Sequence, residues 1–203
     1  MSERRPVRVL HVLSGCTMGG CEHHVLALLS RLDRQRFEPW VACFEAEPDA
    51  AEPMIPRFKA AGVRTIDLRA TRRADPSAVW RFGELLRRGK FDIVHVHSFR
   101  TELAAVLWGK VRRLAPLVVR TVHNVDDFYV SPRYGPLTRL SAYGLDRVIA
   151  ISDAVAEYLR DEAAMPPEKV VRIYYGVDPS PFQPDRAPPS RRPEGDPLKR
   201  PTI

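Results

Sequence analysis

The sequence predicts an α/β fold in which a parallel sheet carries helices on both faces. Seven short runs rich in valine, isoleucine and leucine alternate with six segments whose apolar residues recur at helical spacing. Parallel neighbours need a crossover connection, usually a helix, so strict alternation is typical of a doubly wound, Rossmann-like sheet. The 203 residues, 44% of them hydrophobic, suffice for one packed core but are short for two full domains.

Each predicted strand is a short apolar or β-branched run, and a predicted helix follows six of the seven. The strands are VRVLHVL (7–13), EPWVACF (38–44), GVRTIDL (62–68), FDIVHVH (91–97), LVVRTVH (117–123), RVIAIS (147–152) and KVVRIYY (169–175). The helices are expected at 21–32, 54–62, 76–90, 100–114, 135–145 and 152–164. In the last of these, Ser152 suits the N-cap and Asp153 the first turn.

From Tyr175 onward the character of the chain changes. Eight of the 19 prolines fall in this stretch, mixed with arginine, aspartate and serine and without apolar periodicity. The final residues, LKRPTI, look like the start of another strand. We therefore expect one domain at residues 1–178 and a Pro/Arg-rich linker at 179–203 that leads to a second domain absent from this sequence.

The charge and the cysteine content indicate which binding partners and which cellular compartment to expect. The net charge of +7 makes a polyanion or an anionic membrane surface a candidate partner. Three cysteines are few, and odd in number, for a secreted disulfide framework, so we expect a reducing, cytoplasmic environment. The first apolar run is broken by Arg8 and His11 and predicts no signal peptide, and no run is long enough to span a bilayer.

The stretch SGCTMGGCEHH, residues 14–24, joins the first predicted strand to the first helix. Gly15, Gly19 and Gly20 would permit positive φ and close backbone approach, and a helix start presents N–H groups to an anion. The spacing is neither G-x-G-x-x-G nor a P-loop, so no dinucleotide or ATP fingerprint is met. A plain bend, with Glu22 complementing the helix dipole, is the alternative interpretation.

The same stretch also allows a metal site built from Cys16, Cys21, His23 and His24. Zinc ligands usually come in tighter, repeated pairs such as C-x-x-C, whereas here only Cys21 and His24 share a helix face. We therefore predict no metal site and interpret these cysteines and histidines as packing residues.

Two predicted strands end in polar residues that suit a binding crevice. These residues are His97, Ser98, His123 and Asn124. The carboxyl ends of parallel strands meet at one edge of the sheet, where ligands bind near a switch in strand order. An imidazole there can donate to a phosphate or sugar oxygen. His123 is the strongest candidate, whereas His95 and His11 lie deeper and are expected to be structural.

Five motifs occur in a fixed order along most of the chain. They are MGGCEHHVLALLSRL, FDIVHVHS, TVHN, VIAISDAVAEYL and KVVRIYYGVDPSPF, within residues 7–184. Together they resemble the amino-terminal domain of a retaining family 4 (group 1) glycosyltransferase of the GT-B fold. The resemblance implies a two-domain enzyme that moves a sugar from a nucleotide-diphosphate donor, held mainly by the carboxyl-terminal domain, to an acceptor. It implies no metal and no cofactor, because the nucleotide sugar is a co-substrate.

The resemblance also implies roles for particular residues. The family's paired glycines approach the donor's phosphates and correspond to Gly19 and Gly20 here. The histidine beside the transferred sugar corresponds to His123, the catalytic candidate. The acceptor, a sugar or a lipid-linked sugar, would lie against the polar residues after the two strands, which are His97, Ser98 and Asn124.

Two departures from the family pattern matter. Tyr175 stands where the family commonly has asparagine before the Gly-Val-Asp turn, so we expect a side-chain hydrogen bond at the domain exit to be missing. The family's donor-binding arginine, lysine and glutamates belong to a second domain. We therefore expect no transfer by this chain alone, and a separate donor-binding domain or chain would complete the enzyme.

A membrane contact is a further possibility, at the predicted helix 100–114. Its apolar residues recur at near-helical spacing beside arginines and a tryptophan, which suits the anionic inner face of a membrane. These residues are Leu103, Val106, Leu107, Trp108, Val111, Arg112 and Arg113, with Lys110 among them. The alternative is that the stripe packs on the sheet, as in most doubly wound folds.

Two other function classes have weaker support. A non-catalytic nucleotide or nucleic-acid binding module would suit the net charge, but exposed aromatics do not alternate with basic residues and no nucleic-acid-binding motif occurs. We therefore expect no nucleic-acid partner. An NAD-dependent oxidoreductase is disfavoured because the glycine fingerprint is missing and no suitable acidic residue ends the second strand, where Glu45 is the nearest candidate.

Overall fold

The computed structural model describes residues 5–45, 53–72, 75–125, 131, 134–163, 165–177 and 179. Within these ranges seven strands form one sheet in which every neighbouring pair is parallel. They are β1 (Val7–Gly15), β2 (Phe37–Glu45), β3 (Arg64–Asp67), β4 (Ile93–Val96), β5 (Leu117–Val122), β6 (Arg147–Ala150) and β7 (Val170–Arg172). The order β3-β2-β1-β4-β5-β6-β7 confirms the predicted doubly wound sheet.

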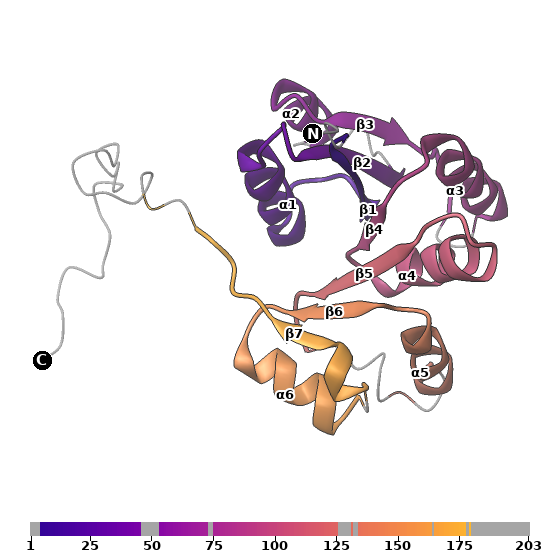
Figure 1. Ribbon diagram of the computed structural model, residues 1–203, viewed down its shortest axis with the longest axis vertical. Coiled ribbons are helices and arrows are strands. Elements are labelled where there is room, and N and C mark those ends of the chain that lie inside the picture. The colour runs from indigo at the N-terminus through magenta and orange to yellow at the C-terminus, as the bar shows by residue number, and fades with distance from the viewer. Residues whose placement is uncertain are drawn as a thin grey trace, which may run out of the picture.

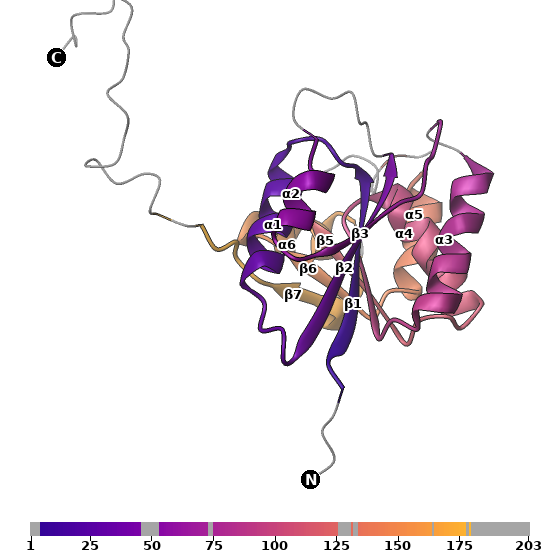
Figure 2. The same cartoon turned by 90° about the horizontal axis from the view of Figure 1, so that it is seen from above.

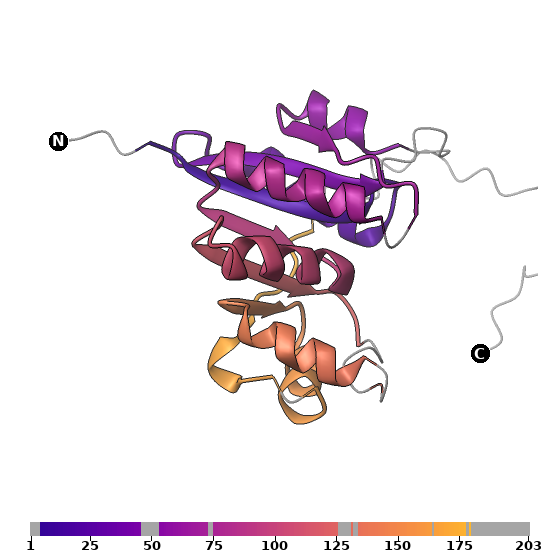
Figure 3. The same cartoon turned by 90° about the vertical axis from the view of Figure 1, so that its right-hand side faces the viewer.

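Helices cover both faces of the sheet, as Figures 1 and 2 show. One face carries α1 (Gly20–Arg31), α2 (Ile55–Ala60) and α6 (Asp153–Asp161). The other carries α3 (Pro76–Gly89), α4 (Phe99–Ala105) and α5 (Gly135–Tyr143), which lie across the sheet in Figure 3. A π-helical segment, η1 (Val106–Val111), continues α4, and a short 3-10 turn, η2 (Pro167–Lys169), precedes β7. All six predicted helices are present.

Side chains along β1 alternate between the two faces because successive residues of a strand point to opposite sides. Leu10 and Val12 enter the larger apolar cluster, which includes residues of α3, α5 and α6. Leu13 enters the smaller cluster, which packs α1 and α2 on the sheet. His11 shares the parity of Leu13, and it is therefore on the α1 side of the sheet that the histidines gather.

Helix α4 differs from the amphipathic helix expected at 100–114. Leu107 is 44% exposed and Val111 is 68% exposed, so these residues do not pack on the sheet. In their place Glu102 is buried, ion-paired with Arg120 of β5 and accepting a hydrogen bond from the Ser141 hydroxyl of α5. The π-helical segment changes the angular spacing after Ala105, which explains why a regular 3.6-residue repeat mispredicts the buried face.

A disulfide joins Cys16, just after β1, to Cys43 of β2, and Cys21 is free. The small, odd number of cysteines predicted a reducing compartment, and no disulfide pair was inferred from the sequence. The pairing of β1 with β2 brings these two residues together although 27 positions separate them in sequence, and spacing alone gives no sign of it.

Two further sequence expectations concern membrane-spanning helices and the predicted linker. Among the described residues, no helix combines the length and apolar character needed to cross a bilayer. The predicted linker 179–203 lies outside the described residues apart from Pro179.

Candidate functional site

The candidate site is a cavity at the carboxyl edge of β1, β4 and β5. The strand order switches direction between β1 and β4, which is where doubly wound sheets open a crevice for ligands. The cavity has a volume of about 860 Å³, and its wall contains all four polar residues predicted from the strand ends. These are His97, Ser98, His123 and Asn124.

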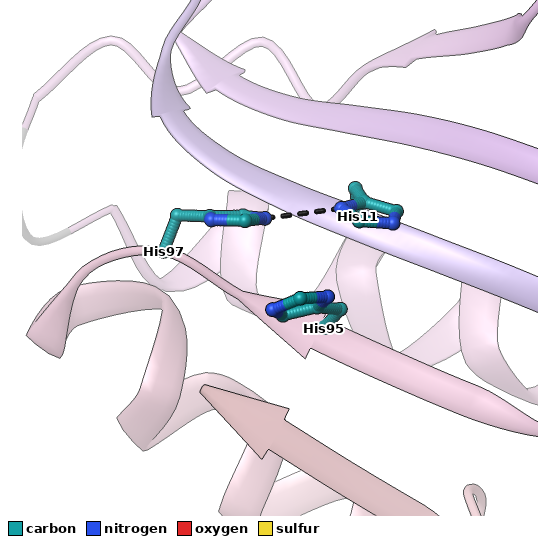
Figure 4. Close-up of side chains that lie close together, drawn as sticks. All are labelled: His11, His95 and His97. Carbon is teal, nitrogen blue, oxygen red and sulfur yellow. Dashed lines mark hydrogen bonds between the residues drawn. The ribbon is translucent and has the colours of Figure 1, made fainter. Parts of the chain in front are cut away.

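A row of imidazoles lies on the sheet beside this cavity. Strand pairing sets His11 of β1 directly across from His95 of β4. His97, two residues further along, brings its Nε2 to 3.0 Å from Nδ1 of His11. Figure 4 shows these two rings edge to edge, with His95 beneath them. His95 bonds Thr121 Oγ1 through its Nε2 at 2.7 Å.

The row continues to His123, the strongest candidate from the sequence. Nε2 of His123 lies 3.1 Å from Nδ1 of His97 and 3.3 Å from Sγ of Cys21, the second residue of α1. Its Nδ1 is hydrogen-bonded to the Tyr175 hydroxyl. The Tyr175 ring stacks on His24 of α1, with ring centroids 3.6 Å apart. Both ring nitrogens of His123 therefore have partners within the protein.

Tyr175 corrects an expectation from the sequence. Replacement of the family's asparagine at this position predicted a missing hydrogen bond at the domain exit. Tyr175 instead makes a hydrogen bond to His123 and stacks its ring on His24, the fifth residue of α1. The phenol is long enough to cross from the segment after β7 to the site, which the local sequence did not indicate.

Burial keeps these imidazoles uncharged at neutral pH. It lowers the pKa of His11 to about 3 and that of His123 to about 4. The pKa of His97 is well below its usual value, first because of burial and then because of the neighbouring histidines. Burial also raises the pKa of the Cys21 thiol. The cluster is therefore a set of neutral donors and acceptors.

The hydroxyls and charges around the cavity have defined partners. The Ser98 side chain caps the start of α4 by accepting from the Thr101 amide, and it also contacts the Ser14 hydroxyl. Arg100 pairs with Glu45 at 2.5 Å on the cavity wall. Glu45, the acidic residue nearest the end of the second predicted strand, is thus paired with a guanidinium. Asn124 is exposed at the mouth.

The glycines after β1 do not adopt the predicted conformation. Gly62 is the glycine with positive φ among the described residues, and Gly19 is extended, with φ −147° and ψ 172°, as the N-cap of α1. A Cβ on Gly19 would lie 2.6 Å from a carboxylate oxygen of Glu22, whereas one on Gly20 would meet nothing within 4 Å. Neither glycine lines the cavity, but Cys21, the next residue, does.

Sequence reasoning missed three contributors to this site, which are Cys21, His24 and Tyr175. Cys21 and His24 were interpreted as packing residues. Their spacing of three on one helix face was the available signal, because a helix that starts beside the strand ends turns that face toward the sheet. No comparable signal marks Tyr175, which reaches the site from the segment after β7, the last strand in the sheet order.

Comparison with known families decides the classification. The model of Glycosyltransferase Family 4 matches residues 18–181. The chain belongs to this glycosyltransferase family. Comparison with curated protein sequences gives no significant match.

Solved structures confirm the fold of this family 4 chain. A glycosyltransferase from Rickettsia africae superposes with TM-score 0.68 at 18% identity, over 92% of this chain and 47% of that one. HepE from Anabaena, solved with UDP and glucose, has TM-score 0.68 at 15% identity, over 88% and 47%. A UDP-GlcNAc 2-epimerase from Neisseria meningitidis, bound to UDP-GlcNAc, has TM-score 0.58 at 17% identity, over 82% and 45%. The chain spans about half the length of these structures.

Proposed function

We propose that this chain is the acceptor-side half of a glycosyltransferase that moves a sugar, with retention, from a nucleotide-diphosphate donor to a sugar or lipid-linked sugar. The observation that carries the proposal is the cavity at the strand-order switch, which unites His97, Ser98, His123 and Asn124 next to the start of α1. The solved relatives with UDP or UDP-sugars support a nucleotide-sugar donor.

The start of α1 is the proposed contact for the donor's diphosphate. Helix amides favour an anion there, and Gly20 leaves the space beside its Cα open. The carboxylate of Glu22 lies close to Gly19 and must turn away when a phosphate approaches. Because the amides already point outward, the departing diphosphate gains charge in a prepared environment.

His123 is the proposed contact for the transferred sugar. It is half-buried on the cavity wall, and its neutral imidazole can exchange a hydrogen bond with a sugar hydroxyl when one of its present partners, Tyr175 or His97, gives way. His97 is more deeply buried than His123 and is bonded to it, so in this proposal it positions His123. Ser98 and Asn124 then form the acceptor side of the cavity.

The rest of the enzyme is proposed to be a carboxyl-terminal donor-binding domain or a separate chain. No cofactor is needed in this proposal, because the nucleotide sugar is the co-substrate. We place the reaction in the cytoplasm, where nucleotide sugars would be available to it; this placement rests on the family resemblance, because disulfides such as Cys16–Cys43 are rare in reducing compartments. Transfer by the 203-residue chain alone is not expected.

Calorimetric titration with UDP, GDP and their sugars tests the proposal, using this chain and a full-length parent that contains the second domain. Donor binding is expected only with the second domain present. Tight binding by this chain without transfer by the parent would instead favour a non-catalytic nucleotide-binding module.

A pair of variants in the parent locates the chemistry. His123→Asn should lower kcat by about 100-fold, the usual cost of losing one group that contacts the reacting centre. His23→Asn, on the exposed face of α1, is the matched control and should leave kcat unchanged. Equal rates for both variants would remove His123 from the reaction.

A further inference from the structure

Three potential metal ligands converge on one point of the cavity wall. Nε2 of His123 is 3.3 Å from Sγ of Cys21 and 3.1 Å from Nδ1 of His97. All three ligand atoms lie within 4.8 Å of one another. They come from α1 and from the ends of β4 and β5, so the fold rather than the sequence spacing assembles them.

The separations match those around a tetrahedral zinc ion. With Zn–N about 2.0–2.1 Å and Zn–S about 2.3 Å, tetrahedral angles put two nitrogens about 3.3 Å apart and nitrogen and sulfur about 3.6 Å apart. The two distances at His123 are 3.1 and 3.3 Å. Two of the three separations are therefore within a few tenths of an ångström of the tetrahedral values, and the third, between Cys21 and His97, is within 4.8 Å.

Hydrogen bonding alone does not explain why both Cys21 and His97 lie close to the same nitrogen of His123. Nε2 of His123 carries either one hydrogen or one lone pair, yet both Cys21 and His97 approach it. The other nitrogens of the two imidazoles already have partners, since Nδ1 of His123 bonds Tyr175 and Nε2 of His97 bonds His11. Such outer partners fix the tautomer of a metal-binding histidine and leave its remaining lone pair for the metal.

The neighbouring group of His11, His95 and His97 suits a metal less well, although its nitrogens are also close. Figure 4 shows why: His95 lies beneath the other rings, and its ring is stacked against His97 with centroids 4.5 Å apart. A coordinating lone pair lies in the plane of its ring, so stacked rings do not aim at a common ion. His95 also uses Nε2 for Thr121.

We propose that Cys21, His97 and His123 bind one zinc ion, with the fourth coordination position open to the cavity. Thiolate and imidazole are the ligands that zinc prefers, whereas Mg²⁺ and Ca²⁺ prefer oxygen. On binding, a Zn–S bond replaces the S–H bond of Cys21 and the proton passes to solvent. Two neutral imidazoles and one thiolate leave the site with a single positive charge.

Zinc binding also has a consequence for the function proposed above. This consequence depends on the proposed function, whereas zinc binding itself does not. The ion would occupy Nε2 of His123 and leave that atom unable to meet a sugar. Zinc should therefore inhibit transfer by the full-length parent, and a chelator should restore it. The binding test below uses this chain alone and does not depend on transfer.

The direct test is titration of the whole 203-residue chain with Co²⁺ as a spectroscopic probe. We expect one Co²⁺ per chain, a sulfur-to-cobalt charge-transfer band, the intense visible bands of a tetrahedral ion, and displacement of both by Zn²⁺ but not by Mg²⁺. Saturation without a sulfur band would overturn the proposed ligand set, and absence of binding would overturn the site.

Variants of the chain identify the ligands. Cys21→Ser should abolish the sulfur band, and His97→Gln or His123→Gln should weaken zinc binding by at least about 100-fold, since even outer-partner changes cost 10–100-fold. Tyr175→Phe should weaken it by about 10-fold. His23→Gln, two positions from Cys21 and exposed, is the control and should bind zinc as tightly as the unmodified chain does. Loss of binding in His95→Gln but not in His123→Gln would assign the ion to the other group.

An unmodified chain gives an independent readout if a variant fails to fold. Cys21 is the free cysteine, so thiol alkylation reports on it alone. Zn²⁺ should slow this alkylation at least 10-fold, and EDTA should reverse the effect. An unchanged alkylation rate at saturating Zn²⁺ would contradict coordination by Cys21.

Discussion

The two edges of the sheet treat polar groups in opposite ways. At the amino edge, charges are paired and partly exposed. Arg5 binds both carboxylate oxygens of Asp92 at 2.7–2.8 Å, and Arg8 pairs with Glu38 at 2.9 Å. At the carboxyl edge a row of buried or half-buried imidazoles, such as His123, is held neutral. Pairs of opposite charge therefore hold the first edge, whereas hydrogen bonds between neutral rings are prominent at the second.

Among single substitutions, one in the buried pair of Glu102 and Arg120 should give the largest loss of stability. Glu102→Gln removes the carboxylate from a guanidinium that is only 4% exposed, which typically costs about 3–5 kcal/mol of unfolding free energy. Glu84→Gln breaks an exposed pair with Arg87 and should leave the urea midpoint almost unchanged. Equal losses in urea unfolding would remove the distinction between the buried and exposed pairs.

The pH dependence of stability should separate the two edges. The pKa values of His11 and His123 are lowered by folding, so the unfolded chain takes up protons first as the pH falls. Stability from these residues should be complete above about pH 6.5 and decline toward pH 4 for His123 and pH 3 for His11, by about 1.4 kcal/mol for each unit of pKa difference.

The amino edge should respond in a different window. The Arg5 guanidinium lowers the pKa of the Asp92 carboxyl, so that contribution is lost only when the pH falls below about 3.8, the ordinary value. Urea titrations at several pH values measure both windows. The decline between pH 6.5 and 4 should be shallower in His123→Gln, and an unchanged slope would contradict the buried neutral state of that residue.

Gly83 and Gly20 differ in the space that surrounds an added Cβ. A Cβ at Gly83 of α3 would lie 2.6 Å from the Trp108 ring, so Gly83→Ala should destabilise the chain by about 1–3 kcal/mol. Gly20→Val adds a side chain where nothing lies within 4 Å and should leave the melting temperature nearly unchanged. In the full-length parent, however, it should raise the donor KM. Unchanged kinetics would show that the phosphates do not approach Gly20.

The smallest expected effect concerns membranes. Leu107 and Val111 are exposed on the π-helical segment, next to the exposed Arg112 and Arg113. Each basic residue near an anionic surface contributes about 1 kcal/mol, so sedimentation with anionic liposomes should exceed that with neutral ones. Leu107→Ser with Val111→Ser should reduce it. Equal pelleting with neutral and anionic vesicles would remove the electrostatic contribution.

Sequence periodicity predicted every strand and α-helix of the described fold, because a sheet covered on both faces requires apolar runs in alternation with helical stripes. It also placed His97 and His123 at the right edge, since strand ends meet there in any parallel sheet. It could not place Cys21 beside His123, which are 102 positions apart and meet only through the strand order. The conformation at Gly19 and the π-helical segment depend on packing that no local pattern records.

Tyr175 links the segment after β7 to the candidate site. Its hydroxyl is bonded to His123 and its ring is stacked on His24, so the path of the backbone there and the orientation of the imidazole are set together. A shift of this segment would therefore free Nδ1 of His123 and unstack the His24 ring in one movement.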